Sequence, residues 1–230
     1  MIRNYHDFVA ALLEAGFSGP VFGKDEGVFS LFGYGWGFDE GSGIEWHTNC
    51  PDTDPWLWRL RVFEERSDIA YGKIFFRKAG FITKEWYPYF YTARRRHIDF
   101  DEEYESGAIS HFAKRLYYAV LENPNILPNQ LKRAAGFTRE EKPRFDSALT
   151  DLQMRMYITI SGVKRNISRE GKEYGWTTTV FDTPERFFGD AVMENAKKMT
   201  AEEAVERISE RILQLNPAAN RKKMGKFISG

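Results

Sequence analysis

The sequence has little of what several protein classes require. Its 230 residues include a single cysteine, so no disulfide forms within the chain, and a reducing cytoplasm is the expected compartment. No apolar run approaches the ~20 residues of a membrane-spanning helix. The first seventeen residues are amphipathic and contain Asp7 and Glu14, unlike a signal peptide. These absences predict a soluble, intracellular protein without membrane contact.

What the sequence does contain is enough apolar material for a core. Hydrophobic residues make up 42% of the chain and aromatic residues 16%, which excludes a disordered or low-complexity protein. At roughly 100–200 residues per domain, the length allows one large or two small domains.

Charge and tryptophan are unevenly distributed. Residues 1–109 carry 12 Lys/Arg and 18 Asp/Glu, whereas residues 110–184 carry 12 and 8, and five of the six tryptophans precede residue 90. This asymmetry predicts an aromatic-rich N-terminal module at 1–109, with the acidic stretch 99–107 as the joint. A second module is expected at 110–190, and a C-terminal helix with a basic tail at 191–230. The tail, residues 221–230, is expected to be solvated, and a phosphate contact is the alternative.

Two helices are predicted early in the N-terminal module. Apolar residues at helical spacing indicate a helix over 4–15 that stops at Gly16. A second helix starts where Asp54 precedes Pro55, because Asp is a good N-cap and Pro is tolerated in the first turn. Trp58 then lies on the apolar face and is expected in the core. Trp56 points roughly 200° away, at about 100° per residue, and is expected to be more exposed.

The same region holds candidates for chemistry. Carboxylates that activate water, beside aromatic side chains that stack on a flipped base, are one way to build a base-excision site. The candidate carboxylates are Glu45, Asp52 and Asp54, and the candidate pocket residues are Trp56, Trp58 and Trp86. Helix capping and loop hydrogen bonding are the alternative and favoured use of these carboxylates.

Neither a metal nor a cofactor is expected. His47 and Cys50 fall short of the three or four ligands of a zinc site. The glycine-rich run 33–43 lacks the following helix of a dinucleotide fingerprint, so it is interpreted as a turn. The run Arg94, Arg95, Arg96 and His97 suits either phosphate or structural pairing at a helix C-terminus, and the structural use is favoured.

The middle of the chain predicts an ordered set of elements. A helix over 110–124 is followed by a short helix over 127–137 and a longer helix over 138–158. Thr138 and Glu141 have capping-box spacing at the start of the longer helix. Two strands follow, over 157–163 and 176–182, with a polar hairpin between them. The predicted class is α+β: a winged helix-turn-helix module joined to an aromatic-rich α/β N-terminal module.

Basic residues occupy the positions that such a module presents to duplex DNA. Phosphate neutralisation by Lys and Arg supplies most non-specific affinity, and the front of the third helix normally enters the major groove. Glu140 and Glu141 dilute this charge, and Pro143 shortens or kinks the helix. A protein-binding use is therefore the alternative. The candidate DNA-binding residues are Lys132, Arg133, Arg139, Lys142, Arg144, Lys164, Arg165, Arg169 and Lys172.

Three segments carry a resemblance to a known family. They are TDPWLWRLRVFEERSDIAYGKIFFRKAGFITKEWYPYFY, GFTREEKPRFDSALTDLQMRMYITISG and GWTTTVFDTPERFF. Over roughly residues 45–190 the chain resembles a bacterial family related to the AlkZ-type DNA glycosylases, which are built from winged helices and unhook crosslinked bases. The resemblance implies a winged-helix architecture and a link to DNA repair.

One departure separates the chain from those glycosylases. They carry a catalytic Gln-x-Gln or Gln-x-Asp element, which none of the glutamines here forms: they stand in Gln130-Leu-Lys, Gln153-Met-Arg and Gln214-Leu-Asn. The sequence therefore predicts a DNA-binding protein without glycosylase activity. The alternatives are a glycosylase-like enzyme acting on damaged bases, a small-molecule sensor and a protein-interaction module.

Overall fold

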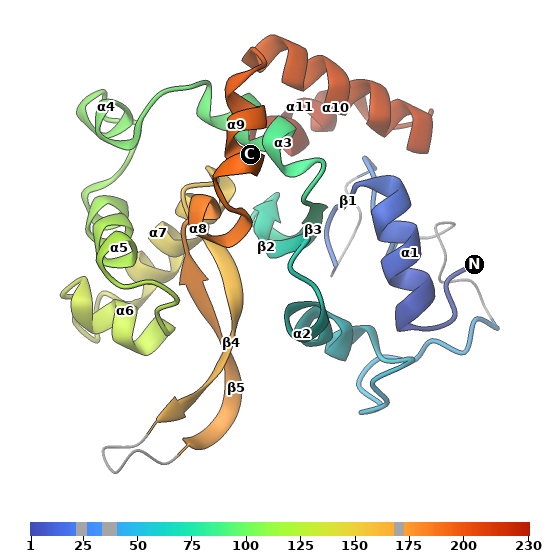
Figure 1. The fold of residues 1–230 in the computed structure, drawn as a ribbon, viewed down its shortest axis with the longest axis horizontal. Helices are drawn as coiled ribbons and strands as arrows, with labels where there is room; N and C mark the ends of the chain where they lie inside the picture. The colour runs from blue at the N-terminus through green and yellow to red at the C-terminus, as the bar shows by residue number, and fades with distance from the viewer. Residues whose placement is uncertain (22–26, 34–40, 168–172) are drawn as a thin grey trace.

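The computed structural model describes residues 1–21, 27–33, 41–167 and 173–230 of the chain (Figure 1). Within these residues, eleven helices accompany a three-stranded and a two-stranded antiparallel sheet, which agrees with the α+β class. The first half contains α1 (Tyr5–Ala15), β1 (Phe17–Ser18), α2 (Pro55–Glu65), β2 (Ile69–Phe75), β3 (Lys78–Thr83) and α3 (Tyr87–Arg95). The middle contains α4 (Phe100–Glu105), α5 (His111–Glu122), α6 (Pro128–Ala134), α7 (Lys142–Met154), β4 (Thr159–Ile167) and β5 (Glu173–Asp182). The last part contains α8 (Pro184–Phe188), α9 (Asp190–Lys197), α10 (Ala201–Leu215) and α11 (Arg221–Ser229).

The three-stranded sheet lies at the centre of the molecule. Its strand order is β1-β3-β2, with α1 on one side and α5–α7 on the other (Figure 1). The predicted stop of the first helix is confirmed, because Gly16 takes the left-handed conformation at φ 92° and its N–H bonds the carbonyl of Leu12. Phe17 on β1 then packs against the rings of Phe29 and Phe90 in an aromatic core.

Helix α2 confirms the predicted cap and faces. It starts at Pro55 with Asp54 as N-cap. Trp58 is 0% exposed and stacks on Phe8 at a centroid distance of 5.1 Å, whereas Trp56 is 37% exposed. The i, i+4 spacing of Trp58 and Val62 therefore placed the buried face correctly.

The prediction of a solvated C-terminal tail is wrong. Residues 221–229 form α11, and Met224, Phe227 and Ile228 are buried. The Phe227 ring stacks on Phe75 of β2, with centroids 4.0 Å apart and planes at 10°. The four cations of this segment suggested solvent exposure, but the i, i+3, i+4 spacing of its apolar residues gives an amphipathic helix that docks on the central sheet.

In the middle of the chain the elements follow the predicted order with shifted bounds. Helix α7 starts at Lys142, four residues after the predicted start, because the turn before it is closed by a bond from Thr138 N–H to the Glu141 carboxylate (3.0 Å). The strands are longer than predicted, so Lys164 and Arg165 lie on β4 instead of in a hairpin loop. Ile126, between α5 and α6, exchanges two backbone hydrogen bonds with Phe181 of β5.

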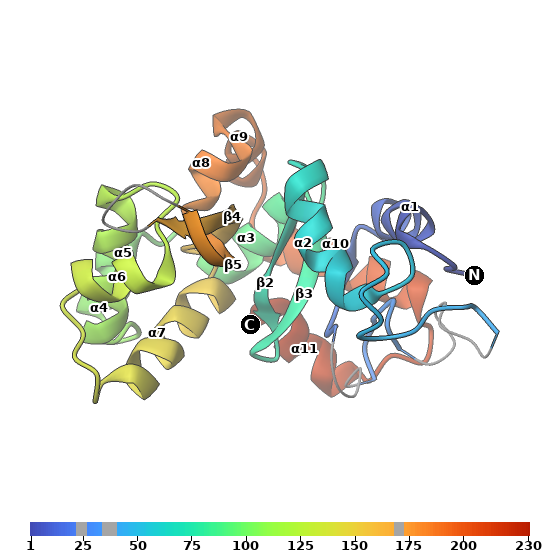
Figure 2. The same ribbon diagram turned by 90° about the horizontal axis from the view of Figure 1, so that it is seen from below.

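The β4–β5 ribbon projects from the body of the molecule, while its base and α7 pack against the central sheet (Figures 1 and 2). At the free edge of the sheet, the Lys73 N–H donates to Oε1 of the buried Gln153 at 3.0 Å. This side-chain amide supplies the acceptor that an additional strand would otherwise provide. The apolar core is continuous across this contact.

Candidate nucleic-acid interface

The candidate carboxylate Asp54 is buried and fully engaged in hydrogen bonds within the fold. It is 0% exposed and accepts hydrogen bonds from the backbone N–H of Trp56 (2.9 Å), His47 (3.1 Å) and Asn49 (3.2 Å). These bonds cap α2 and hold the preceding loop, in which His47 and Asn49 both have φ 62°. A carboxylate engaged in this way has no open approach for water, so the geometry gives Asp54 a structural role.

The other predicted front-module residues do not converge on one pocket. Asp52 is a surface residue 3.5 Å from Arg61, and Glu45 is exposed. Trp86 is 7% exposed and packs in the core against Phe17, at a centroid distance of 5.4 Å. The assignment of Trp86 to a pocket wall is therefore wrong, because this ring fills the space beside Gly16, where a Cβ would lie 2.2 Å from it.

Trp56 has different neighbours from Trp86. The Arg59 guanidinium lies over its ring at 3.8 Å, and the His47 ring is 5.1 Å away. Trp56 is thus exposed, as predicted, and the Arg59 guanidinium covers one face of its ring. In the part of the chain that the structure describes, no three His, Cys, Asp or Glu side chains come together as a metal site.

The arginine run of α3 is used structurally. Arg94 is buried and donates to three backbone carbonyls, those of Met154 (2.7 Å), Phe227 (2.9 Å) and Ile228 (2.9 Å). It thereby joins the C-terminal ends of α7 and α11, and burial lowers its pKa to about 9. Arg95 donates to the Tyr91 hydroxyl at 2.7 Å. Arg96 pairs with Glu202 at 3.0 Å, so the favoured interpretation of the run is supported by its geometry.

The cations around the α6–α7 turn have few such partners. Arg133 and Arg139 are exposed, and no carboxylate among the described residues lies within 4.0 Å of either. Lys142 pairs with Asp146 at 2.5 Å, one helical turn away. The Arg144 guanidinium lies 5.0 Å above the Phe112 ring. With the half-buried Lys132, these residues form what we call the α6–α7 surface: Lys132, Arg133, Arg139, Lys142 and Arg144.

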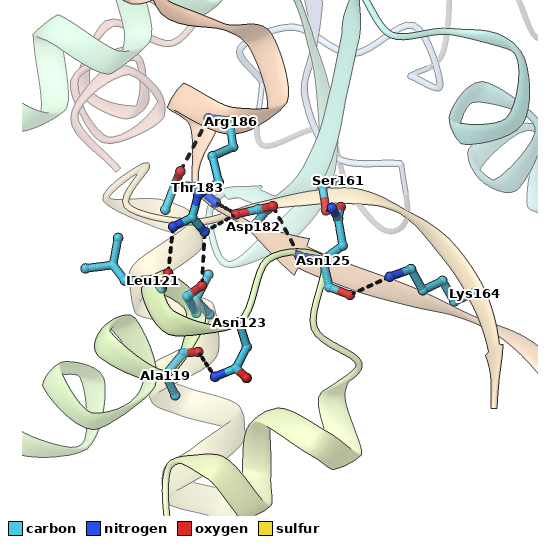
Figure 3. A network of polar contacts seen from close by, with 10 residues as sticks. Ala119, Leu121, Asn123, Asn125, Ser161, Lys164, Asp182, Thr183 and Arg186 are labelled. Atoms are coloured by element: carbon cyan, nitrogen blue, oxygen red, sulfur yellow. Dashed lines mark hydrogen bonds and ion pairs between the residues drawn. The ribbon is translucent and has the colours of Figure 1, made fainter. Parts of the chain in front are cut away.

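The β4–β5 ribbon adds two exposed cations at the described part of its length, Lys164 and Arg165. The Lys164 ammonium donates to the Asn125 carbonyl at 3.1 Å, which places it beside the turn between α5 and α6 (Figure 3). Arg169 and Lys172, predicted for the same interface, lie outside the described residues.

A polar network fixes the base of the ribbon to the end of α5 (Figure 3). Asp182, 2% exposed, accepts from the N–H groups of Asn125 (3.1 Å) and Thr183 (2.8 Å) and pairs with Arg186 at 2.8 Å. Arg186 also donates to the Leu121 carbonyl at 2.6 Å. Sequence analysis missed this network, although the i, i+4 spacing of Asp182 and Arg186 is a signal for it.

The exposed side chains of α7 lie in its first two turns, up to Ser147. The β2–β3 hairpin meets the helix there: its Arg77 donates to the Ser147 hydroxyl at 3.2 Å and pairs with Asp151 one turn later. Gln153 faces β2, as described above. The first turn, with Lys142 and Arg144, is left exposed.

A cavity of about 210 Å³ lies where α2, β2, α7 and the ribbon meet. Arg59, Tyr71, Asp146 and Gln153 contribute its polar lining. Burial raises the pKa of the Tyr71 phenol, so this group is a neutral hydrogen-bonding side chain at pH 7.

Comparison with known proteins places the chain in a family. The model of the AlkZ-related family matches residues 2–229, and the chain belongs to that family. No curated protein and no solved structure shows significant similarity to it. Among the described residues, no helix combines the length and apolar character needed to cross a bilayer.

Proposed function

We propose that this member of the AlkZ-related family binds duplex DNA with the α6–α7 surface and the β4–β5 ribbon, which together act as a winged helix-turn-helix module. The order of elements supports the proposal: α5, the Ile126 bridge, α6, α7 and then the two ribbon strands. The family's relation to DNA glycosylases supports DNA as the partner. The network around Asp182 gives the ribbon a fixed direction relative to α5 and α6.

The observation that carries the proposal is the lack of carboxylate partners at Arg133 and Arg139. An arginine already paired with a carboxylate gains less from a phosphate, because the existing pair must first be broken. An exposed and unpaired arginine releases the counterions of a phosphate without that loss. Both side chains flank the turn that leads into α7, the helix that a helix-turn-helix protein presents to DNA.

The exposed part of α7 also bears on the mode of binding. The exposed residues of α7 lie in its first two turns, between Lys142 and Ser147, and beyond them Arg77 of the hairpin pairs with Asp151. We expect contacts from this short exposed part and from the ribbon to reach phosphates more readily than base edges. Phosphate contacts position a protein without carrying sequence information, so binding with little sequence preference is expected.

The proposal assigns no catalytic residue. Asp54 caps α2, and Gln153 is engaged with the Lys73 N–H and with the Leu149 carbonyl, to which it donates at 3.0 Å. In this role the protein holds or marks a DNA site and leaves base removal to another enzyme.

Binding to a 20-base-pair duplex, measured by fluorescence anisotropy at several salt concentrations, tests the proposal. The test variant is Arg133→Gln with Arg139→Gln, and the matched control is Arg96→Gln with Arg207→Gln. The control arginines are also exposed but pair with Glu202 and Glu210. We expect the log–log salt slope of the test variant to be less steep by about 1.8, with roughly tenfold weaker binding, and the control to match the parent. Salt-independent binding by the parent, or equal losses in the two variants, would overturn the proposal.

A further inference from the structure

Helix α11 carries a second concentration of positive charge. Residues 216–230 contain four Lys/Arg and no Asp or Glu. Arg221, Lys222 and Lys226 are exposed, and Lys223 is half-buried. No carboxylate among the described residues lies within 4.0 Å of the three exposed cations.

The cations in the first turn of α11 destabilise the helix that carries them. Arg221, Lys222 and Lys223 occupy the first turn, where the helix dipole is positive and acidic residues are favoured. The helix is held by its buried face, through Phe227 on Phe75, and by the Asn220 cap on the Lys223 N–H at 3.1 Å. Since Arg221 and Lys222 weaken the helix at this position, its folding does not explain their presence, and an anion bound beside this turn would relieve the repulsion.

The cations surround a concave site with an aromatic wall. A cavity of about 320 Å³ is lined by Phe76, Lys222, Lys223 and Lys226. Phe76 lies in the turn of the β2–β3 hairpin at φ 51°, and its ring is 6.0 Å from Phe227. The three lysine side chains that line this hollow bring three positive charges to one place on the surface, which favours an anionic partner.

The hairpin turn also connects this site to the proposed DNA surface. Phe76 contacts α11, and the next residue, Arg77, contacts Ser147 and Asp151 on α7. Helices α7 and α11 lie along the same edge of the molecule, on either side of the hairpin end (Figure 2). From Lys142 to Ser147 the helix rises only about 7.5 Å, so the α6–α7 surface begins close to this junction.

We propose that Phe76, Arg221, Lys222, Lys223 and Lys226, called here the α11 patch, form a second contact with the phosphate backbone of the same duplex. This inference rests on the proposed DNA binding and extends the contact beyond the module of residues 110–190. An anionic membrane is the less suitable partner. The apolar side chains of α11 are already buried in the core, at 5% exposure for Met224 and 0% for Phe227, so no apolar face remains to enter a bilayer.

The test variant is Lys222→Gln with Lys226→Gln, and its matched control is Lys197→Gln with Lys198→Gln on α9, which removes the same charge from two exposed lysines. Duplex binding is measured against salt, as for the α6–α7 surface, together with the melting temperature. We expect a slope less steep by about 1.8 and roughly tenfold weaker binding for the α11 variant only. Its melting temperature should stay close to that of the parent, because Lys222 lies at the positive end of the helix and Lys226 in its last turn, so the two substitutions have opposite effects on the helix.

The outcomes separate the two proposals. If the α6–α7 variant loses binding and the α11 variant behaves like its control, the α11 patch is refuted and the proposed function stands. If only the α11 variant loses binding, the patch is supported and the proposed α6–α7 surface is refuted. A parent that binds no duplex refutes both. Vesicles containing phosphatidylserine form a further arm, and loss of vesicle binding without loss of DNA binding in the α11 variant would also refute the patch as a DNA contact.

Discussion

The arginines of α3 and those around the α6–α7 turn look alike in sequence and are used in opposite ways. Arg94 is buried and donates to the carbonyl oxygens of Met154, Phe227 and Ile228. Arg133 and Arg139 are exposed and have no carboxylate partner among the described residues. The difference shows that a run of basic residues can offer its guanidinium N–H groups to a ligand only where the fold has not already engaged them in hydrogen bonds or ion pairs.

Two tryptophans of α2 show the same contrast and provide the largest expected effect. Trp58 is fully buried and its indole N–H donates to the Asp52 carbonyl at 3.2 Å, whereas Trp56 stacks on the surface with Arg59. We expect Trp58→Ala to cost about 3–5 kcal/mol of unfolding free energy, and Trp56→Ala less than about 1 kcal/mol. Urea unfolding followed by circular dichroism measures both. A larger loss for Trp56→Ala would show that the two faces of α2 are reversed.

Arg94 tests the structural side of the arginine comparison. The substitution Arg94→Met preserves much of the side-chain volume but leaves three buried carbonyls without their donor, at a cost of about 2–4 kcal/mol. The measurement is the urea midpoint, accompanied by duplex affinity under conditions where the variant is folded. Stability is expected to fall while affinity stays within twofold of the parent. If affinity fell and stability did not, Arg94 would belong with the binding arginines.

Asp54 gives a similar test among carboxylates. Because it caps α2 and accepts two further loop N–H groups, Asp54→Ala is expected to destabilise the fold by about 1–2 kcal/mol. The control is Asp52→Ala, at an exposed position nearby, with an expected change below about 0.5 kcal/mol. Thermal unfolding of both variants measures the difference. Equal melting temperatures for the two variants would show that the Asp54 carboxylate contributes no more to the stability of the fold than the exposed Asp52 carboxylate.

Alkaline pH tests the buried tyrosines of the fold. Burial raises the pKa of Tyr5 to about 12 and raises the pKa values of Tyr87 and Tyr157 as well, while an unfolded tyrosine titrates near 10. Their contribution to stability is complete below pH 10 and is lost as the pH rises through 10 towards 12, because only the unfolded state releases the proton. Arg94 acts in the opposite direction above pH 9, since its folded pKa is lowered. We expect the tyrosines to dominate.

The matching variant is Tyr157→Phe, which keeps the ring beneath Arg95 and removes a buried hydroxyl that has no hydrogen-bond partner among the described residues. Its urea midpoint at pH 7 should equal or slightly exceed that of the parent, and its loss between pH 9 and pH 11 should be smaller. A free energy of unfolding at pH 7 lower by more than about 1 kcal/mol would instead indicate a hydrogen bond at this hydroxyl.

Local sequence signals predicted much of the fold. The cap at Asp54 and the stop at Gly16 are found in the structure, because each depends on a few neighbouring residues. The wrong predictions concern residues whose environment is set by contacts with residues far away in the sequence. Residues 221–229, expected to be solvated, form a helix whose Phe227 stacks on Phe75. Trp86, assigned to a pocket wall, fills the core beside Gly16.

The candidate interface was predictable only in part for the same reason. The sequence identifies where the cations are, and α6 and α7 place them at one turn. It does not show which cations find a carboxylate, nor that Arg77 reaches α7 from seventy-four positions away to cover Asp151. It also cannot show that Asp182 and Arg186 brace the ribbon against Asn125 and Leu121, since these contacts depend on the tertiary fold.

The comparison is tested most directly by lysine acetylation footprinting of the protein with and without a 20-base-pair duplex, read by mass spectrometry. Lysines at the proposed interface should become protected when DNA is bound, and lysines outside both this interface and the α11 patch should react equally in both states. The lysines expected to be protected are Lys132, Lys142 and Lys164, and those expected to be unchanged are Lys84, Lys197 and Lys198. Equal protection of the two sets, or protection of the second set alone, would contradict the assignment of DNA binding to the α6–α7 surface and the ribbon.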